Sequence, residues 1–268
     1  MSLALLEYEF RLRRRVVIGW GLLVALWLAF TIWYWSTLEE PAVEELRRLI
    51  EQSPEWVIRF FAKGSPVAFT YQVYYVLEYH MVVYVLLLGA LAAYLGAGAV
   101  VDDVPGRTGG LAMLATPTSR TGVLLVRLAA LVAVAVVLTL TSLITSTALQ
   151  LVLVGGGEPW WLVKLHLAGL PYLVTCTTLG LLAGSTLPAS IAKPTAAGLV
   201  LAMYVAEMTT KGTRLEGVSL LTITHYYPTL EIALNNITPV TETATLIVIA
   251  LALTTLSIVF YNRKDLPV

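Results

Sequence analysis

Six apolar stretches, separated by short polar segments, divide this chain. They cover residues 16–38, 71–101, 121–154, 160–187, 195–208 and 240–261. A hydrocarbon core of about 30 Å takes about 20 residues of helix to cross, and most of the stretches supply at least that many. The pattern predicts an all-α integral membrane protein with about six transmembrane helices, in a single transmembrane domain that covers residues 1–268.

The residues before the first span have a different pattern. Leu3, Leu6 and Phe10 follow one another at three- and four-residue spacing, which places them on one face of a helix. Residues 1–15 are therefore predicted to form an amphipathic helix at the membrane interface. The arginines at 13–15 are expected to face the lipid headgroups.

Two polar segments contain apolar pieces of their own, and both are predicted to lie on the side of the membrane opposite the N-terminus. Residues 39–70 are predicted to include a short helix from Pro41 to Gln52. Residues 209–239 are too polar to cross the membrane, although Leu215–Ile223 and Leu230–Ile237 are apolar. This second segment is predicted to be a re-entrant or outer-surface element before the last span.

Composition and charge agree with a membrane protein. Hydrophobic residues make up 58% of the chain and charged residues 13%, and the mean hydropathy is +0.80. The net charge is zero, so nothing in the overall charge favours nucleic acid as a partner. The single cysteine, Cys176, excludes a disulfide framework and a multi-cysteine metal site.

Basic residues outside the spans indicate the orientation, because cytoplasmic segments carry more of them. Nine lie on the side of the N-terminus: Arg11, Arg13, Arg14, Arg15, Arg107, Arg120, Lys193, Arg263 and Lys264. Six lie on the other side: Arg47, Arg48, Arg59, Lys63, Lys211 and Arg214. Both termini are predicted to be cytoplasmic.

The sequence contains none of the usual nucleotide-hydrolysis or zinc-protease motifs, and it lacks a glycine-rich dinucleotide fingerprint. Its histidines, His80, His166 and His225, fall in different segments. We therefore expect that the chain is not itself an enzyme.

The basic turn between the second and third spans is the most distinctive motif. It reads GRTGGLAMLATPTSR from Gly106 to Arg120. Pro117 can fix a break between two helices, and Thr116, Thr118 or Ser119 can cap the helix that follows. The turn is thus predicted to present a short helix on the cytoplasmic side.

This turn, with the start of the third span, resembles the conserved turn of type-2 ATP-binding-cassette (ABC) exporter permeases. The elements that carry the resemblance are Asp102, Asp103, Gly109, Met113, Leu114, Ala115 to Arg120, and Arg127. An N-terminal Leu-x-x-Glu-x-x-x-Arg pattern within Leu5 to Arg13 and the ending Arg263, Lys264 and Asp265 also agree. The chain has aspartates where the family has glutamates, and Pro105 intrudes, which leaves the register of the turn open.

The resemblance implies that the short helix is a coupling helix seated on a separate cytosolic ATPase. The residues implied in coupling are Arg107, Thr108, Gly109, Gly110, Leu111, Met113, Leu114, Pro117 and Arg120. It implies no cofactor on this chain, with ATP and magnesium held by the partner subunit. It also implies pairing with a second copy or a sister permease, in the plasma or inner membrane of a prokaryotic cell.

Polar side chains within the spans are candidates for a translocation path or an outer vestibule, because ionisable groups are costly in lipid. The candidates are Glu78, His80, Ser142, Ser146, Gln150 and Glu207. The third span carries a polar stripe, called the hydroxyl stripe below, made of Thr139, Ser142, Ser146 and Gln150 at three- and four-residue spacing, with Thr141 and Thr145 alongside. The stripe should face protein or cargo, and helix packing is favoured over a translocation surface as its role. Glu78 could also pair with Lys164 across spans.

Other functions stay open at this point. The chain could transmit force from an ABC ATPase without moving cargo. A secondary transporter or channel would show inverted repeats and paired charges near mid-membrane, and an intramembrane enzyme would show clustered carboxylates or histidines. Neither pattern is visible in the sequence. The leading hypothesis is an ABC exporter permease with an unidentified substrate.

Overall fold

The structure, a computed structural model, describes residues 3–53, 69–102, 119–155, 158–211 and 213–263. Every regular element in these ranges is helical. Six helices are long and apolar enough to cross a membrane, which confirms the predicted fold class. They are α1 (Leu3–Thr37), α4 with η1 and α5 (Tyr71–Tyr75, Val76–Leu88, Gly89–Val101), α7 with η2 (Arg120–Leu149, Gln150–Val154), α8 (Trp160–Thr186), α9 (Ala189–Thr210) and α11 (Val240–Arg263).

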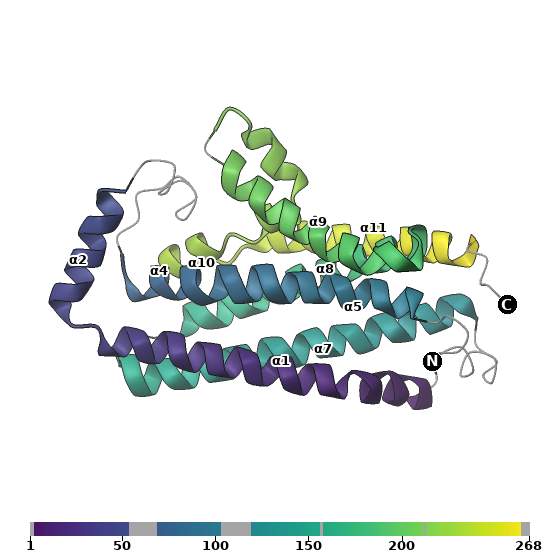
Figure 1. Ribbon diagram of the computed structural model, residues 1–268, viewed down its shortest axis with the longest axis horizontal. Coiled ribbons are helices and arrows are strands. Elements are labelled where there is room, and N and C mark those ends of the chain that lie inside the picture. Colours follow the sequence, from purple (N-terminus) through teal and green to yellow (C-terminus); the bar gives the residue numbers. More distant parts are fainter. Residues whose placement is uncertain (1–2, 54–68, 103–118, 156–157, 212, 264–268) are drawn as a thin grey trace.

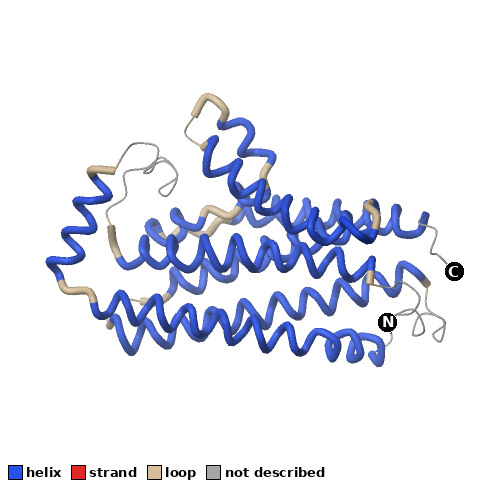
Figure 2. Tube along the Cα trace, viewed as in Figure 1, coloured by secondary structure: helices blue, strands red, loops and turns tan. Residues whose placement is uncertain are grey.

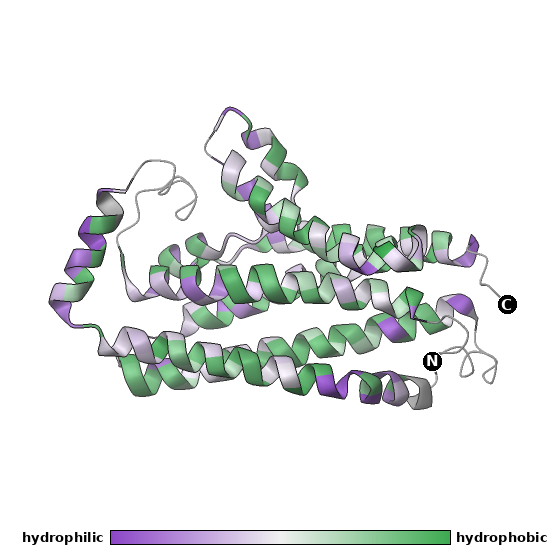
Figure 3. Ribbon diagram, in the orientation of Figure 1, coloured by the Kyte–Doolittle hydropathy of each residue, from purple (hydrophilic) through white to green (hydrophobic). Residues whose placement is uncertain are grey.

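The long helices run side by side along one axis (Figures 1 and 2). The start of α1 and the end of α11 lie at one end of this bundle, beside the start of α7, and we call it the termini end. Helix α2 (Glu40–Glu51) crosses the opposite end, called the α2 end below. Figure 3 shows hydrophilic residues concentrated at the two ends and on α2, with apolar residues along the helices between them, as a bilayer-spanning bundle requires.

Helix α8 is the centre of the bundle. In its most apolar window 67% of residues are buried, against 17% for α9 and for α11. Glycines let α8 and α5 approach closely, since a Cβ atom on Gly180 would lie only 2.0 Å from the carbonyl oxygen of Ala93. On the other helix, a Cβ on Gly96 would lie 2.1 Å from the carbonyl oxygen of Thr177. Small residues at such contacts are typical of packed helices in membranes.

The middle of the second span has wider turns than an α-helix. Residues Val76–Leu88 form a π-helix, in which the hydrogen bonds close over five residues. The exposed side chains here are Glu78, Val82 and Leu87, at steps of four and five. The wide turns therefore keep one continuous face, including Tyr79, His80 and Tyr84, buried against the other helices.

Two helix boundaries differ from the sequence prediction. The N-terminal residues 3–15 continue into the first span as one helix, α1, without a break at residue 15. The fifth span begins at Ala189 rather than at residue 195, with Pro194 inside the helix. Ala192 and Ala196 are completely buried on either side of this proline, so packing sustains the helix before residue 195, where the sequence prediction had not begun the span. The interfacial position of residues 1–15 stays a prediction.

The polar segment before the last span folds back into the bundle. It contains η3 (Glu216–Leu221), η4 (Ile223–Tyr226) and α10 (Thr229–Asn235). The end of α9 and η3 project from the side of the bundle in Figure 1, whereas α10 returns to lie beside α4 and α8. Tyr227, between η4 and α10, is buried. Its side chain therefore anchors the segment among the spans.

Candidate functional site

The predicted coupling turn lies almost entirely outside the described residues. This applies to Arg107, Thr108, Gly109, Gly110, Leu111, Met113, Leu114 and Pro117. Its last two residues are described: Ser119 precedes α7, and Arg120 is the first residue of that helix and is exposed. The Ser119 hydroxyl accepts a hydrogen bond from the Gly122 amide at 3.1 Å. Ser119 is thus the predicted cap of the third span.

Two polar contacts join the helices that flank the turn to the last two spans. At the end of α5, Asp102 accepts bonds of 2.5 and 2.7 Å from the ammonium group of Lys193 on α9. At the start of α7, the Asn262 side-chain amide of α11 donates to the Thr121 hydroxyl at 3.1 Å. Both contacts lie at the termini end, beside the two ends of the turn.

A third contact is buried and joins the first helix. The Arg127 guanidinium of α7 donates from Nε to Glu9 of α1 at 3.1 Å, and from Nη1 to the carbonyl oxygen of Ala99 on α5 at 2.8 Å. The side chains of Arg127 and Glu9 are only 6% and 5% exposed. Arg13 also pairs with Glu9. We call Glu9, Arg13 and Arg127 the charged cluster.

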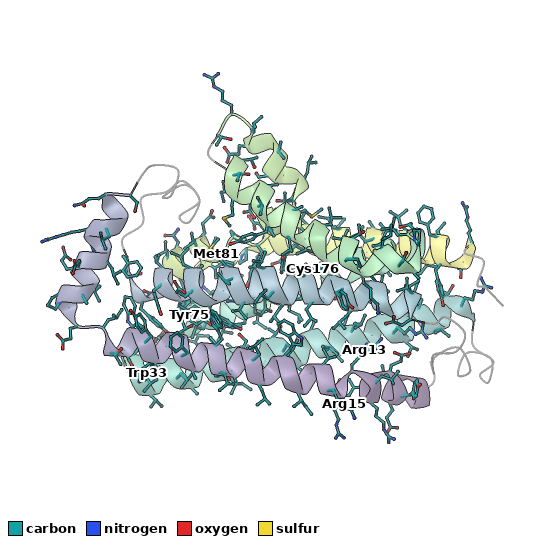
Figure 4. All side chains as sticks on the ribbon, viewed as in Figure 1. Arg13, Arg15, Trp33, Tyr75, Met81 and Cys176 are labelled. Atoms are coloured by element: carbon teal, nitrogen blue, oxygen red, sulfur yellow. The ribbon has the colours of Figure 1, made fainter. Side chains whose placement is uncertain are left out.

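The charged cluster corrects one prediction. Arg13 was expected to face the headgroups, but it turns inward from α1 to Glu9, while Arg15 points away from the bundle (Figure 4). The reason is the buried carboxylate of Glu9, which needs positive partners. Removing one partner from a buried ion pair costs about 3–5 kcal/mol, because the other charge is left uncompensated.

Nearer the α2 end, the buried polar side chains form hydrogen-bonded chains. His166 Nδ1 lies 2.8 Å from the carbonyl oxygen of Leu162, so this nitrogen carries the proton and Nε2 accepts. Ser142 then donates to His166 Nε2 at 2.6 Å and accepts from the Tyr79 hydroxyl at 2.5 Å. In this series of hydrogen bonds each group donates to the next, from Tyr79 through Ser142 and His166 to the carbonyl of Leu162. The series joins three spans.

A second series of hydrogen bonds centres on Tyr227. The Tyr227 hydroxyl donates to the carbonyl oxygen of Leu165 at 2.7 Å and is in hydrogen-bond contact with His80 Nε2. Since a hydroxyl has one proton, His80 Nε2–H is the donor in that contact. Burial raises the pKa of Tyr227 well above its ordinary value, so the hydroxyl keeps its proton. The glycine at position 169 leaves space for the Tyr227 hydroxyl, because a Cβ atom there would lie only 2.6 Å from it.

The candidate path residues separate into two groups. Those buried inside the chain are His80, Ser142, Ser146, Gln150 and Glu207. Glu78 is instead exposed on the bundle surface, where the Trp27 indole N–H donates to its backbone carbonyl at 3.3 Å. The suggested pair of Glu78 with Lys164 is wrong, because Lys164 donates to the carbonyl oxygen of Asn236 at 2.5 Å. A connected path through these residues stays a prediction.

Several partners in these contacts had no assigned role from sequence. Tyr79, Tyr84 and Tyr227 were not among the candidate residues. The structure brings Tyr79 and Tyr84 against the hydroxyl stripe of the third span, where the Tyr79 hydroxyl bonds to Ser142 and the Tyr84 hydroxyl lies 2.7 Å from that of Thr139. Spacing along the second span alone does not reveal these contacts. Within the described ranges, no group of three or more His, Cys, Asp or Glu side chains converges as a metal site would.

Comparison with known proteins gives one match. Residues 3–266 match the protein family described as "ABC-2 family transporter protein". No curated protein and no solved structure matches the chain. The match covers the described helices of the bundle, the turn between α5 and α7, and the charged cluster.

Proposed function

Since the chain belongs to the ABC-2 transporter family, whose membrane proteins work with ABC ATPase subunits, we propose that it is the permease subunit of an exporter. Two permease subunits, identical or related, form the path for cargo. The partner ATPases bind and hydrolyse ATP with magnesium. The complex sits in the plasma or inner membrane of a prokaryotic cell, with both termini of this chain in the cytoplasm.

The observation that carries the proposal is the family match over nearly the whole chain, together with the place of the turn. Helix α5 ends at Val101 and α7 starts at Arg120, so the turn connects two long spans at the termini end. A helix seated on an ATPase at this point can move both spans when the ATPase closes. The contacts of Asp102 with Lys193, and of Thr121 with Asn262, would extend that movement to α9 and α11.

Co-purification in mild detergent tests the ATPase coupling. The variant Arg107→Glu with Leu114→Asp should lose the ATPase partner and still insert in the membrane. A matched control makes the same charge changes far from the turn, at Arg214 and Leu221, which are both exposed beyond the end of α9. Equal recovery of the ATPase with both variants would contradict the coupling assignment. A preparation of the unmodified chain that is inert toward ATP would favour a secondary transporter or channel.

The cargo path needs a separate test, and Glu78 is the most useful position. It is the exposed carboxylate of the second span, on the wide-turn segment. In our proposal the Glu78 carboxylate faces the cargo in the assembled complex. An apolar surface with a single carboxylate suits a lipid, a hydrophobic drug, a peptide or a glycolipid. Glu78→Gln should change cargo-stimulated ATPase activity without lowering assembly. An unchanged response would assign Glu78 no role in transport.

A further inference from the structure

We propose that Glu9 and Arg127 are positioning residues, which deliver the movement of α5 and α7 to the first helix. This inference rests on the proposed coupling to an ATPase. It assigns a mechanical role to two charged residues that lie outside the turn itself. The first helix makes no chain connection to the turn, so it can follow the turn only through side-chain contacts.

The geometry places Arg127 between three helices. It lies seven residues after Arg120, which is about two helical turns into α7. Its Nη1 contact reaches Ala99, two residues before the end of α5 at Val101. Its Nε contact reaches Glu9 on α1. One guanidinium group thus joins both helices that flank the turn to the first helix.

Burial makes these contacts hard to exchange. The Glu9 and Arg127 side chains are almost fully buried, so water cannot replace either partner when the helices shift. The neighbouring pair of Glu7 with Arg11 has the same sequence spacing as Glu9 with Arg13, but both its side chains are more than 60% exposed. Water and salt screen an exposed pair of that kind. Apolar packing, such as that of Leu6 against Val123 and Val126, also holds α1 to α7. The Glu9–Arg127 contact adds a directed polar link to this packing.

Guanidinium chemistry explains why an arginine stands at position 127. Its donors point in fixed, separate directions, so a single side chain can bind a carboxylate on one helix and a carbonyl on another. A lysine at this position would keep the charge but has a compact head on a flexible stem. It could not hold Glu9 and Ala99 in the same fixed arrangement.

Hydrogen exchange of the complex with its co-purifying ATPase tests the proposal. Exchange is compared before and after trapping with ATP, magnesium and orthovanadate, in two segments, residues 3–15 and residues 119–130. In the unmodified complex, trapping should change exchange in both. Glu9→Gln should retain the change in residues 119–130 and lose it in residues 3–15. The matched control Glu7→Gln should keep both changes.

The possible outcomes separate this inference from the proposed function. A trapping-dependent change in residues 3–15 that survives in Glu9→Gln would overturn the role of the charged cluster. No change in either segment of the unmodified complex would overturn the coupling function instead. If Glu9→Gln does not assemble, Arg127→Lys is the second variant, with the same loss expected in residues 3–15. Persistence of that signal in assembled Arg127→Lys would refute the positioning role.

Discussion

The contact between α5 and α8 gives a prediction whose size follows from one distance. In Gly180→Ala the new methyl group would lie 2.0 Å from the carbonyl oxygen of Ala93, and 2.9 Å from the amide nitrogen of Ala97. Ordinary van der Waals contact begins at 3.4 Å, so the two backbones would have to part by about 1.4 Å at this point. Neither neighbour is a flexible side chain that could turn aside.

Overpacking of this kind costs about 1–3 kcal/mol. The helix propensity of alanine offsets this by at most about 1 kcal/mol. Gly198→Ala, on α9, is the matched control, because a Cβ there has nothing within 4 Å. The control should be neutral or slightly stabilising. Gly180→Ala should therefore be less stable than Gly198→Ala by about 1–3 kcal/mol.

Thermal unfolding of the purified protein in mild detergent, followed by tryptophan fluorescence, measures the difference. Each kcal/mol corresponds to about 2–4 °C in Tm for a chain of roughly 150–250 residues. A Tm for Gly180→Ala equal to or above that of Gly198→Ala would refute the reasoning, because it would mean that α5 and α8 are not in backbone contact.

Three further predictions concern the polar contacts. Ser142→Ala should destabilise the protein by about 1–3 kcal/mol in the same assay, because it leaves a buried nitrogen of His166 without its donor; an unchanged Tm would argue against the chain of hydrogen bonds. Tyr227→Phe should increase hydrogen exchange in residues 213–235, whereas Tyr226→Phe, which loses one exposed bond, should not; equal effects would contradict the anchor. Asp102→Asn should change the free energy of unfolding by less than about 1 kcal/mol, because the Asp102 carboxylate, which pairs with Lys193, is half exposed. A fall in Tm that corresponds to a larger change would contradict this weak ion pair.

The fold was predictable from sequence because the membrane reduces it to a question of length and apolarity. Six apolar stretches gave six helices, and the predicted short helix at 41–52 is α2 at Glu40–Glu51. The start of α9 was misplaced because Pro188 and Pro194 are typical of a turn. A proline indicates only that the local backbone disfavours a helix. The burial of Ala192 and Ala196, which stabilises the helix, depends on other helices far away in the sequence.

The site was predictable in its parts but not in its connections. Ser119, Arg127 and the hydroxyl stripe were each identified from the sequence. That Glu9 meets Arg127 across 118 residues could not be inferred, because helical spacing relates only residues within one helix. The same limit applies to His80 with Tyr227 and to Lys164 with Asn236, since each pair joins segments whose relative rotation is set by packing.

The close approach of α5 and α8 also restricts how this chain can diverge in evolution. At positions 96, 180 and 184 any side chain would meet the backbone of the facing helix, so a substitution can persist only if both helices change together. Among the described residues of this chain, most positions of α9 and α11 are not buried against another helix, and these can exchange one apolar residue for another. Relatives of this chain should therefore differ most where it meets lipid and least along this glycine contact, whatever cargo each has come to carry.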